Sequence, residues 1–520
     1  MVDEVQDIVD SPFRVREKAF RVIVVGAGVA GLAAAVKLER AGITDFAVLE
    51  KADRVGGTWR DNTYPGCGVD IPSALYSFSF NPNPGWTRLY ASQSEILGYL
   101  EDTVVKFDLR RYLHLRTEMI EAAWSEHRRR WMVETTRGTY VAQYIVLATG
   151  PINEPSIPPV DGLADFPGEV FHSARWDHEV ELTGKRVAVI GTGASVAQFV
   201  PEIQPKVARL HIFQRTAPWV FPRLDLPIPA ITRSMFRYLP IAQYGLRMAA
   251  DVGHRAYTML MRRGYTAQLL GPASSCWLAW HVPDAELRAA LTPSYTVGCK
   301  RVLLSNTYLA ALTRPNVELL PQEFAGVSGR QVIARDGARR EVDVIIFGTG
   351  FDVIDLPIAS RVRGRDGTLL ADRWGGSPEA YLCTTVPGLP NAFVLLGPNI
   401  LIYNSFIGLA ESQLGYVTDA LVKAERANVE VLEVRDEPFR AFNDKLQAEL
   451  SRTVLNTGGC VSFYHDRNGK NFAAWPWSTG SMRRAHARFD LKNYTTQGYR
   501  GPGDGIPPTT APLPGEFARY

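Results

Sequence analysis

Arg21-Val-Ile-Val-Val-Gly-Ala-Gly-Val-Ala-Gly31 is a short β-branched run that ends in a GxGxxG glycine pattern. An alanine-rich helical pattern follows, and a second apolar run, residues 46–49, ends at an acid. The order strand, glycine turn, helix, strand, acid is typical of a dinucleotide-binding unit, in which a pyrophosphate approaches the helix N-terminus and the acid accepts from ribose hydroxyls. The residues predicted to bind this nucleotide are Gly26, Gly28, Gly31 and Glu50.

The same unit recurs later in the chain. The β-branched run 186–190 leads into Gly191-Thr-Gly193-Ala-Ser-Val196, then a helical pattern and the run 210–213. Glu50 lies 24 residues after Gly26, and the residue at the same distance after Gly191 is Arg215. A cation in place of the acid favours a 2′-phosphate and therefore NADPH, although a surface arginine at a strand end is the alternative. The residues predicted at this second site are Gly191, Gly193, Ser195 and Arg215.

A further repeat indicates duplication. Residues 140–150 and 341–350 are both apolar runs that end in Thr-Gly, and each would close one dinucleotide unit. With this repeat the chain resembles flavoproteins that have two dinucleotide-binding domains. The resemblance implies an α/β fold of two Rossmann-like dinucleotide-binding domains, one for FAD and one for NADP, with a helical insertion. The expected segments are 1–150 (FAD, first part), 151–220 (NADP, first part), 221–297 (helical insertion), 298–380 (NADP, second part) and 381–520 (FAD, second part, and a C-terminal tail).

Composition narrows the class of protein. A chain of 520 residues suits two or three domains, and its net charge of +3 is too small to indicate nucleic-acid binding. No N-terminal signal pattern is present. Five scattered cysteines without a CxxC pair argue against a disulfide framework and fit a reducing cytosol, so we expect a cytoplasmic protein. They also exclude the redox dithiol of a disulfide reductase, and no metal site is predicted.

The segment 221–297 is apolar and helical in pattern, and it holds four of the eight methionines. Residues 233–263 contain six arginines and one acid, Asp251. Three interpretations stay open: an adaptable lid over an apolar substrate, a basic amphipathic face that touches a membrane, or a helical subdomain with a solvated arginine face.

Two longer stretches identify the chemistry: Gly56-Gly-Thr-Trp-Arg-Asp-Asn-Thr-Tyr-Pro-Gly-Cys-Gly-Val-Asp70 and Phe166-Pro-Gly-Glu-Val-Phe-His-Ser-Ala-Arg-Trp-Asp177. They match GGTWxxxxYPGxxxD and FxGxxxHxxxWD, and they resemble the signature sequences of Baeyer–Villiger monooxygenases. This resemblance implies flavin-site roles for Gly57, Thr58, Trp59 and Tyr64. It implies conformational roles for Phe166, Gly168, His172, Trp176 and Asp177, with His172 as a linker between domains rather than a general base.

The resemblance also places Lys300-Arg301 at a Lys-Arg pair of the family. It implies that Lys300, with Arg215 and Thr216, meets the NADPH 2′-phosphate. Arg301 would stabilise an anionic flavin peroxide, a task that favours arginine because its charge persists in a dry pocket. Asp70 would orient Arg301, and Asn399 would help bind the flavin. Phe463 stands where relatives have tryptophan and lacks the indole donor.

The resemblance covers roughly residues 20–495 and implies an FAD- and NADPH-dependent enzyme that uses O2 to convert an apolar ketone into an ester or lactone. An enzyme that oxygenates nitrogen or sulfur, an uncoupled NADPH oxidase and a non-catalytic flavoprotein are the alternatives. Trp176 and Asp177 disfavour the first of these. The sequence defines neither the particular ketone nor the oligomeric state.

Overall fold

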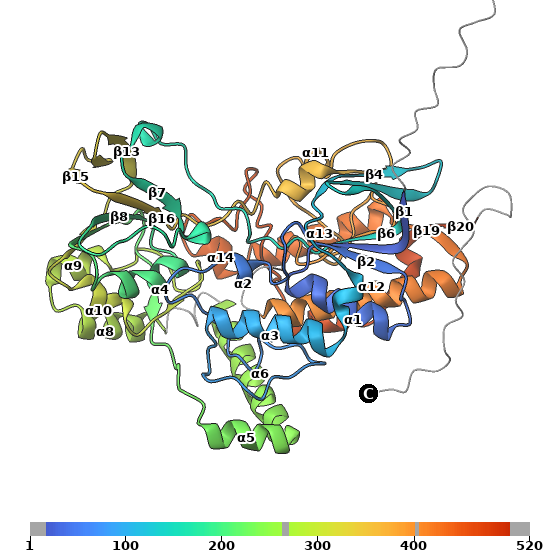
Figure 1. Cartoon of the computed structure of the whole chain (residues 1–520), viewed down its shortest axis with the longest axis horizontal. Helices are drawn as coiled ribbons and strands as arrows, with labels where there is room; N and C mark the ends of the chain where they lie inside the picture. Colours follow the sequence, from blue (N-terminus) through green and yellow to red (C-terminus); the bar gives the residue numbers. More distant parts are fainter. Residues whose placement is uncertain (1–16, 263–269, 401–404, 500–520) are drawn as a thin grey trace, which may run out of the picture.

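The structure, a computed structural model, describes residues 17–262, 270–400 and 405–499 (Figure 1). Two units lie side by side, each built around its own sheet. In the first, β1 (Lys18–Val25) lies between β2 (Phe46–Leu49) and β6 (Gly138–Leu147), with both pairings parallel. The expected strand–glycine–helix–strand unit is confirmed, because α1 (Val29–Arg40) joins β1 to β2.

The first sheet has eight strands in the order β17-β4-β5-β6-β1-β2-β3, with β18 also paired to β6. Its outer strands β4 and β5 form an antiparallel hairpin that precedes β6. The remaining strands are β3 (Leu113–His114), β4 (Met119–Ser125), β5 (Arg130–Thr135), β17 (Val362–Arg363) and β18 (Ala392–Val394).

The second sheet is fully parallel, in the order β12-β9-β8-β16-β7. The helix α4 (Ala194–Ile203) joins β8 to β9, as the repeated glycine pattern predicts. The chain therefore leaves the first sheet after β6, builds the second, and returns at β17 and β18. Its strands are β7 (Glu169–His172), β8 (Arg186–Ile190), β9 (Arg209–Phe213), β12 (Val317–Leu320) and β16 (Val344–Phe347).

This arrangement confirms the predicted α/β class with two dinucleotide-binding sheets, while the exact domain boundaries stay predictions. Smaller pairings complete the architecture: β10 (Val220–Phe221) with β11 (Leu303–Leu304), a hairpin sheet of β13 (Phe324–Ser328), β14 (Gln331–Ala334) and β15 (Arg339–Glu341), and β19 (Val429–Val434) with β20 (Tyr494–Gly498). The other helices outside the insertion are α2 (Thr58–Asp61), α3 (Gln93–Lys106), α10 (Tyr308–Leu312), α11 (Leu370–Trp374), α12 (Phe406–Arg426), α13 (Asp436–Leu450), α14 (Val454–Thr457) and α15 (Thr479–Ala485).

Val196, which departs from the glycine pattern, is accommodated by a glycine on the neighbouring strand end. A Cβ built on Gly348 would lie 2.2 Å from Val196 Cγ2. In the first unit, Ala148 stands at the position of Gly348, and the helix there keeps the third glycine of the pattern, Gly31. The small residue has therefore moved from the helix to the strand, and close helix–strand packing is kept.

The insertion is helical, as predicted. It contains α5 (Ala230–Tyr238), α6 (Pro240–Arg262), α8 (Gly271–His281) and α9 (Ala285–Ala290). Figure 1 places α5 and the start of α6 at one end of the molecule, below both sheets. Among the described residues, no helix combines the length and the apolar character needed to cross a bilayer.

Candidate functional site

The first glycine turn is shaped for close approach of a ligand to the backbone. Gly26 has a φ of 105°, which favours glycine, and a Cβ on Gly31 would lie 1.8 Å from the Gly26 carbonyl oxygen. The helix that follows has no side-chain cap and no acid in its first turn. Its unpaired N–H groups and the positive end of its dipole are suited to a pyrophosphate.

The first long motif begins against this turn. Gly57 lies against Gly28, since a Cβ on Gly57 would be 3.1 Å from the Gly28 Cα, and the Gly56 N–H donates to the Ala27 carbonyl over 3.1 Å. Thr58 donates from Oγ1 to the Ile152 carbonyl over 3.3 Å. Gly57, one of the predicted flavin-site residues of this stretch, therefore lies directly against the glycine turn.

Glu50 is buried at the carboxyl end of β2 and is held from three sides. Its Oε2 accepts from the Ala27 N–H, and its Oε1 accepts from the Ala52 N–H and from Arg60 Nη1, each over 2.9 Å. A carboxylate offers roughly four acceptor positions, so one on Oε2 stays available for a ribose hydroxyl. Arg60, a buried cation that the sequence analysis did not select, fixes the orientation of this acid.

The second glycine turn repeats the first. Gly191 has a φ of 112°, and Gly193 is the N-cap residue of α4. This helix has no side-chain cap and no acid in its first turn, which contains Ser195. Arg215 lies exposed at the end of β9, and Thr216 follows it, accepting a hydrogen bond at its carbonyl from Thr192 Oγ1 over 3.2 Å. This turn is therefore open to a second dinucleotide.

Lys300 is brought close to Arg215 although the two are far apart in sequence. Burial lowers the pKa of Lys300, and the positive charge of Arg215 lowers it further. The Lys300 Nζ also lies 5.2 Å from the centre of the Tyr295 ring. Two cations that repel one another in the absence of a ligand are suited to an anion such as a 2′-phosphate.

Both long motifs meet on one side of α4. The Tyr64 ring of the first motif contacts Phe199 with ring centres 6.1 Å apart, and the Trp176 ring of the second contacts it at 5.3 Å. The Tyr64 hydroxyl donates to Gln198 Oε1 over 2.9 Å, and Gln198 Nε2 donates to the Gly68 carbonyl over 3.0 Å. Tyr64 thus fastens the first motif to the second unit, and its predicted contact with cofactor stays a prediction.

Gly168 and Asp177 of the second motif contact backbone groups of the protein. A Cβ on Gly168 would lie 2.3 Å from the Asp343 carbonyl, and Phe166 is buried beside it. Asp177 is exposed and accepts from the Glu179 N–H over 2.9 Å. The motif therefore packs between β16 and α4.

His172 is buried at the end of β7. Its Nδ1 accepts from the Ala174 N–H over 3.0 Å, while Nε2 has no hydrogen-bond partner among the described residues. Burial, together with the charge of Arg175, lowers the pKa of His172 to about 4. A neutral, buried imidazole at the junction of strand and loop agrees with the linker role that the family resemblance implies.

Arg301 and Asp70 form an ion pair, with Arg301 Nη2 2.7 Å from Asp70 Oδ1. Both side chains are partly exposed, at 30% and 37%. Asp70 ends the first motif, and Arg301 follows the segment that connects the helical insertion to β11. The two residues that the resemblance implies as a pair are therefore brought together although 231 positions separate them in the sequence.

Aromatic residues surround this pair. Trp59 Nε1 donates to the Tyr76 hydroxyl over 3.0 Å, and the backbone N–H of Arg301 donates to the Tyr464 hydroxyl over 3.1 Å. Burial raises the pKa of both Tyr76 and Tyr464. For each of them, the charge of Arg301 lowers the pKa and the charge of Asp70 raises it. Burial also raises the pKa of Tyr257 in α6, and the same two charges act on it. The phenols of these tyrosines therefore stay protonated beside the ion pair.

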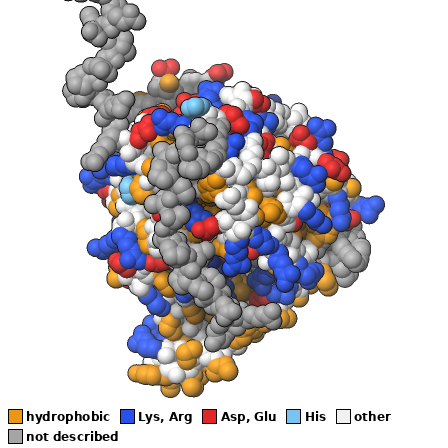
Figure 2. All heavy atoms as spheres, turned by 90° about the vertical axis from the view of Figure 1, so that its right-hand side faces the viewer, with side chains coloured by type: hydrophobic (Ala, Val, Ile, Leu, Met, Phe, Trp, Pro, Cys, Tyr) orange, Lys and Arg blue, Asp and Glu red, His pale blue; other side chains and the backbone are white. Residues whose placement is uncertain are grey.

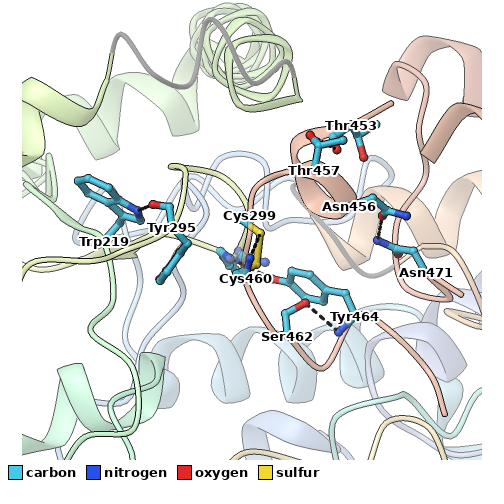
Figure 3. Close-up of a disulfide and its surroundings, with 11 residues drawn as sticks. Trp219, Tyr295, Cys299, Thr453, Asn456, Thr457, Cys460, Ser462, Tyr464 and Asn471 are labelled. Carbon is cyan, nitrogen blue, oxygen red and sulfur yellow. Dashed lines mark hydrogen bonds between the residues drawn. A yellow bond between two sulfur atoms is a disulfide. The ribbon is translucent and has the colours of Figure 1, made fainter. Parts of the chain in front are cut away.

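The expectation that the cysteines form no disulfide is wrong for one pair. Cys299, next to Lys300, is bonded to Cys460 (Figure 3). A separation of 161 residues, with no local spacing pattern, conceals such a pair in the sequence. The bond joins the segment that carries Lys300 and Arg301 to the segment that carries Tyr464. Cys67, Cys276 and Cys383 are free.

Asn399 is hydrogen-bonded to the C-terminal segment that follows Cys460 and Tyr464. It has a φ of 63°, a left-handed conformation that asparagine tolerates, and is buried. Its Nδ2 donates to the Asn471 and Ala474 carbonyls over 3.0 and 3.2 Å. Phe463, which lacks the indole donor, is exposed. Neither Tyr464 nor Gln198 stands out in the sequence, because both act through contacts between distant segments.

Comparisons with known proteins agree with this site. A family described as pyridine nucleotide-disulphide oxidoreductase matches residues 23–241. A Baeyer–Villiger monooxygenase of Streptomyces coelicolor is 46% identical over 491 residues, which cover 91% of this chain and 92% of the relative. A structure of oxidized steroid monooxygenase bound to NADP has a TM-score of 0.82 and 28% identity, covering 92% of this chain and 99% of that one.

A structure of cyclohexanone monooxygenase with bound epsilon-caprolactone is similar over 92% of this chain and the whole of the other, with a TM-score of 0.81 and 26% identity. The predicted family, cofactors and reaction class are confirmed. With its two nucleotide-binding sheets, both signature motifs and relatives that match nearly end to end, the chain belongs to the Baeyer–Villiger monooxygenases, flavin enzymes that depend on FAD and NADPH.

Proposed function

We propose that Arg301 is the catalytic cation of this enzyme and that Asp70 positions it. The observation that carries this proposal is the 2.7 Å ion pair between them, at the place where the first motif meets the disulfide-linked segments. When bound, NADPH supplies a hydride and the reduced FAD activates O2. The Arg301 guanidinium then faces the negative charge that develops at the ketone carbonyl oxygen, and Asp70 limits its rotation.

The residues that fit the two cofactors are separate sets. FAD would be held by the first glycine turn together with Glu50, Gly57, Thr58, Trp59 and Asn399. NADPH would be held by the second turn, with Arg215, Thr216 and Lys300 at its 2′-phosphate. The uncapped N-termini of α1 and α4 and the mutual repulsion of Lys300 and Arg215 support this division.

We propose an apolar ketone as the substrate, since the polar atoms of Trp59, Tyr76 and Tyr464 near the ion pair already have hydrogen-bond partners in the protein. The lactone bound to the related cyclohexanone monooxygenase agrees with this class of compound. A panel of alicyclic, aryl and steroidal ketones, scored by ester or lactone formed per NADPH, tests the class. The expected cytoplasmic location stays a prediction, which cell fractionation tests.

The role of Arg301 is tested with Arg301→Ala. We expect NADPH to reduce the flavin at an unchanged rate under anaerobic conditions, while ester formation falls by roughly 10²–10³, as for the loss of one oxyanion donor. NADPH oxidation should continue with release of H2O2. Arg361→Ala is a matched control, because Arg361 forms a similar ion pair with Glu118 at 2.7 Å, with both side chains about as exposed. Unchanged ester yield in Arg301→Ala would overturn the proposal.

A further inference from the structure

The helices α5 and α6 expose an unusual amount of apolar surface. Hydrophobic side chains gather at the lower end of the molecule in Figure 2, the end at which Figure 1 places α5. Ile231 and Tyr238 are each 80% exposed, and Ile241 is 78% exposed. The other exposed large apolar residues of these helices and of the segment before them are Leu224, Leu226, Met235, Leu239, Tyr244, Met248, Val252, Met259 and Leu260.

The spacing of these residues along α6 defines a face. Positions 241, 244, 248, 252 and 259 recur at helical intervals and are all exposed and apolar. The opposite face carries Ala250, Tyr257 and Met261, which pack against the core of the protein. A helix that is apolar on two opposite faces is expected to be covered on both. Among the residues that the structure describes, only the inner face is covered, and an exposed apolar face of this kind indicates a partner.

The charges on this surface select the kind of partner. Between residues 230 and 260 the only acid is Asp251, whose side chain is 14% exposed and pairs with Arg255 and Arg483. Arg237 and Arg255 are exposed, whereas Arg247 turns inward and donates to the Ala74 and Ser77 carbonyls. Over residues 230–260 the surface is therefore apolar with cationic positions, and the one acid in this range is largely covered.

We propose that α5 and α6 dock on the surface of an anionic phospholipid bilayer. Exposed aliphatic residues would enter the boundary between headgroups and acyl chains, with Tyr238 and Tyr244 at headgroup level and Arg237 at lipid phosphates. Charge complementarity supports a bilayer over a second copy of the chain, since two copies meeting through this face would bring their arginines together.

The same helix connects this surface to the catalytic region. Near its C-terminus, the Met261 carbonyl lies 2.8 Å from where a Cβ on Gly298 would be, next to Cys299. The charges of Arg301 and Asp70 both affect the pKa of Tyr257, which also lies on α6. If the proposed apolar substrate class holds, docking would place the site beside the phase in which such ketones concentrate, although the bilayer contact itself does not depend on it.

Flotation of the purified FAD-loaded enzyme with vesicles tests the proposal. We expect it to float with vesicles that contain phosphatidylglycerol, and markedly less with phosphatidylcholine alone or at high salt. Ile241→Asp should weaken partition by about tenfold or more, because it puts a carboxylate into the apolar face. Ile120→Asp is the matched control: Ile120 is 54% exposed on β4, in the first sheet, and should not alter flotation.

Ester formation from a water-soluble ketone without vesicles should be the same in Ile241→Asp and wild type, so failure of the bilayer contact is separable from failure of the catalytic proposal. No flotation with anionic vesicles, or equal losses in Ile241→Asp and Ile120→Asp, would overturn the inference. It would also be overturned if sedimentation showed a dimer that Ile241→Asp dissociates, since the face would then belong to a second copy.

Discussion

The backbone N–H of Arg301 donates a hydrogen bond to the Tyr464 hydroxyl over 3.1 Å, while the Arg301 side chain pairs with Asp70. The proposed catalytic residue is thus held at two points by segments that are distant in sequence. Tyr464 is almost fully buried and lies close after Cys460. Its hydroxyl and the disulfide together fix the backbone on which the guanidinium stands.

We predict that Tyr464→Phe lowers ester formed per NADPH by about threefold to tenfold, because a small displacement of Arg301 misaligns it with the reacting carbonyl. The rate of flavin reduction by NADPH should not change, and H2O2 release should rise. Tyr308→Phe is the control, since Tyr308 is equally buried and its hydroxyl has no hydrogen-bond partner among the described residues. Equal coupling in both variants would assign Tyr464 a packing role only.

We predict that Cys299→Ser lowers thermal stability, because the cross-link closes a long loop and restricts the unfolded chain, an effect of typically about 2–4 kcal/mol. Differential scanning calorimetry should show a lower Tm, and wild type treated with a reductant should match it. Cys276→Ser is the control, since Cys276 is free and exposed. A wild-type Tm that does not respond to reductant would show that the bond does not form in solution.

How far the sequence could predict this structure depends on whether a contact leaves a local pattern. The glycine turns did, because each forms within one strand–turn–helix unit, and both sheets followed from them. Arg301 and Asp70 were paired only through the family resemblance, since nothing in residue spacing joins them. The helical insertion was predicted from composition, but which of its faces is exposed was not.

Contacts between distant segments left no such pattern. The scattered cysteines argued against a disulfide framework, yet Cys299 and Cys460 are bonded to each other. Gln198 and Phe199 look like ordinary helix residues until two motifs pack on them. Val196 departs from the glycine pattern, and only the structure shows that Gly348 compensates for it.

This compensation makes a double-mutant prediction. Gly348→Ala should destabilise the protein by about 1–3 kcal/mol, because the new methyl group would overlap Val196 Cγ2. Val196→Ala removes that carbon, so Gly348→Ala with Val196→Ala should recover most of the loss. Chemical denaturation of the four proteins gives the coupling energy. Additive losses in the double variant would show that the two side chains do not compete for the same space.

We predict that Arg215→Ala raises the KM for NADPH by about tenfold or more and leaves the KM for NADH nearly unchanged, because only NADPH carries the 2′-phosphate. Lys300→Ala should act in the same direction. Arg209→Ala is the control, since Arg209 is exposed at the other end of β9 and donates to the Pro315 carbonyl. Equal changes for the two coenzymes would place Arg215 outside the phosphate site.

The buried imidazole of His172 predicts a dependence of stability on pH. Its folded-state pKa is lowered to about 4, below the ordinary value of 6.5. Between these values the unfolded chain binds more protons at this residue than the folded chain, so its contribution to stability is lost as the pH falls below 6.5. Near pH 5 the loss is on the order of 1–2 kcal/mol. His172→Asn, whose Oδ1 can still accept from the Ala174 N–H, should lose less Tm than wild type between pH 7.5 and pH 5. Parallel Tm profiles in the two proteins would mean that His172 is protonated without cost in the folded state, and the imidazole would then be free to carry charge in the working enzyme.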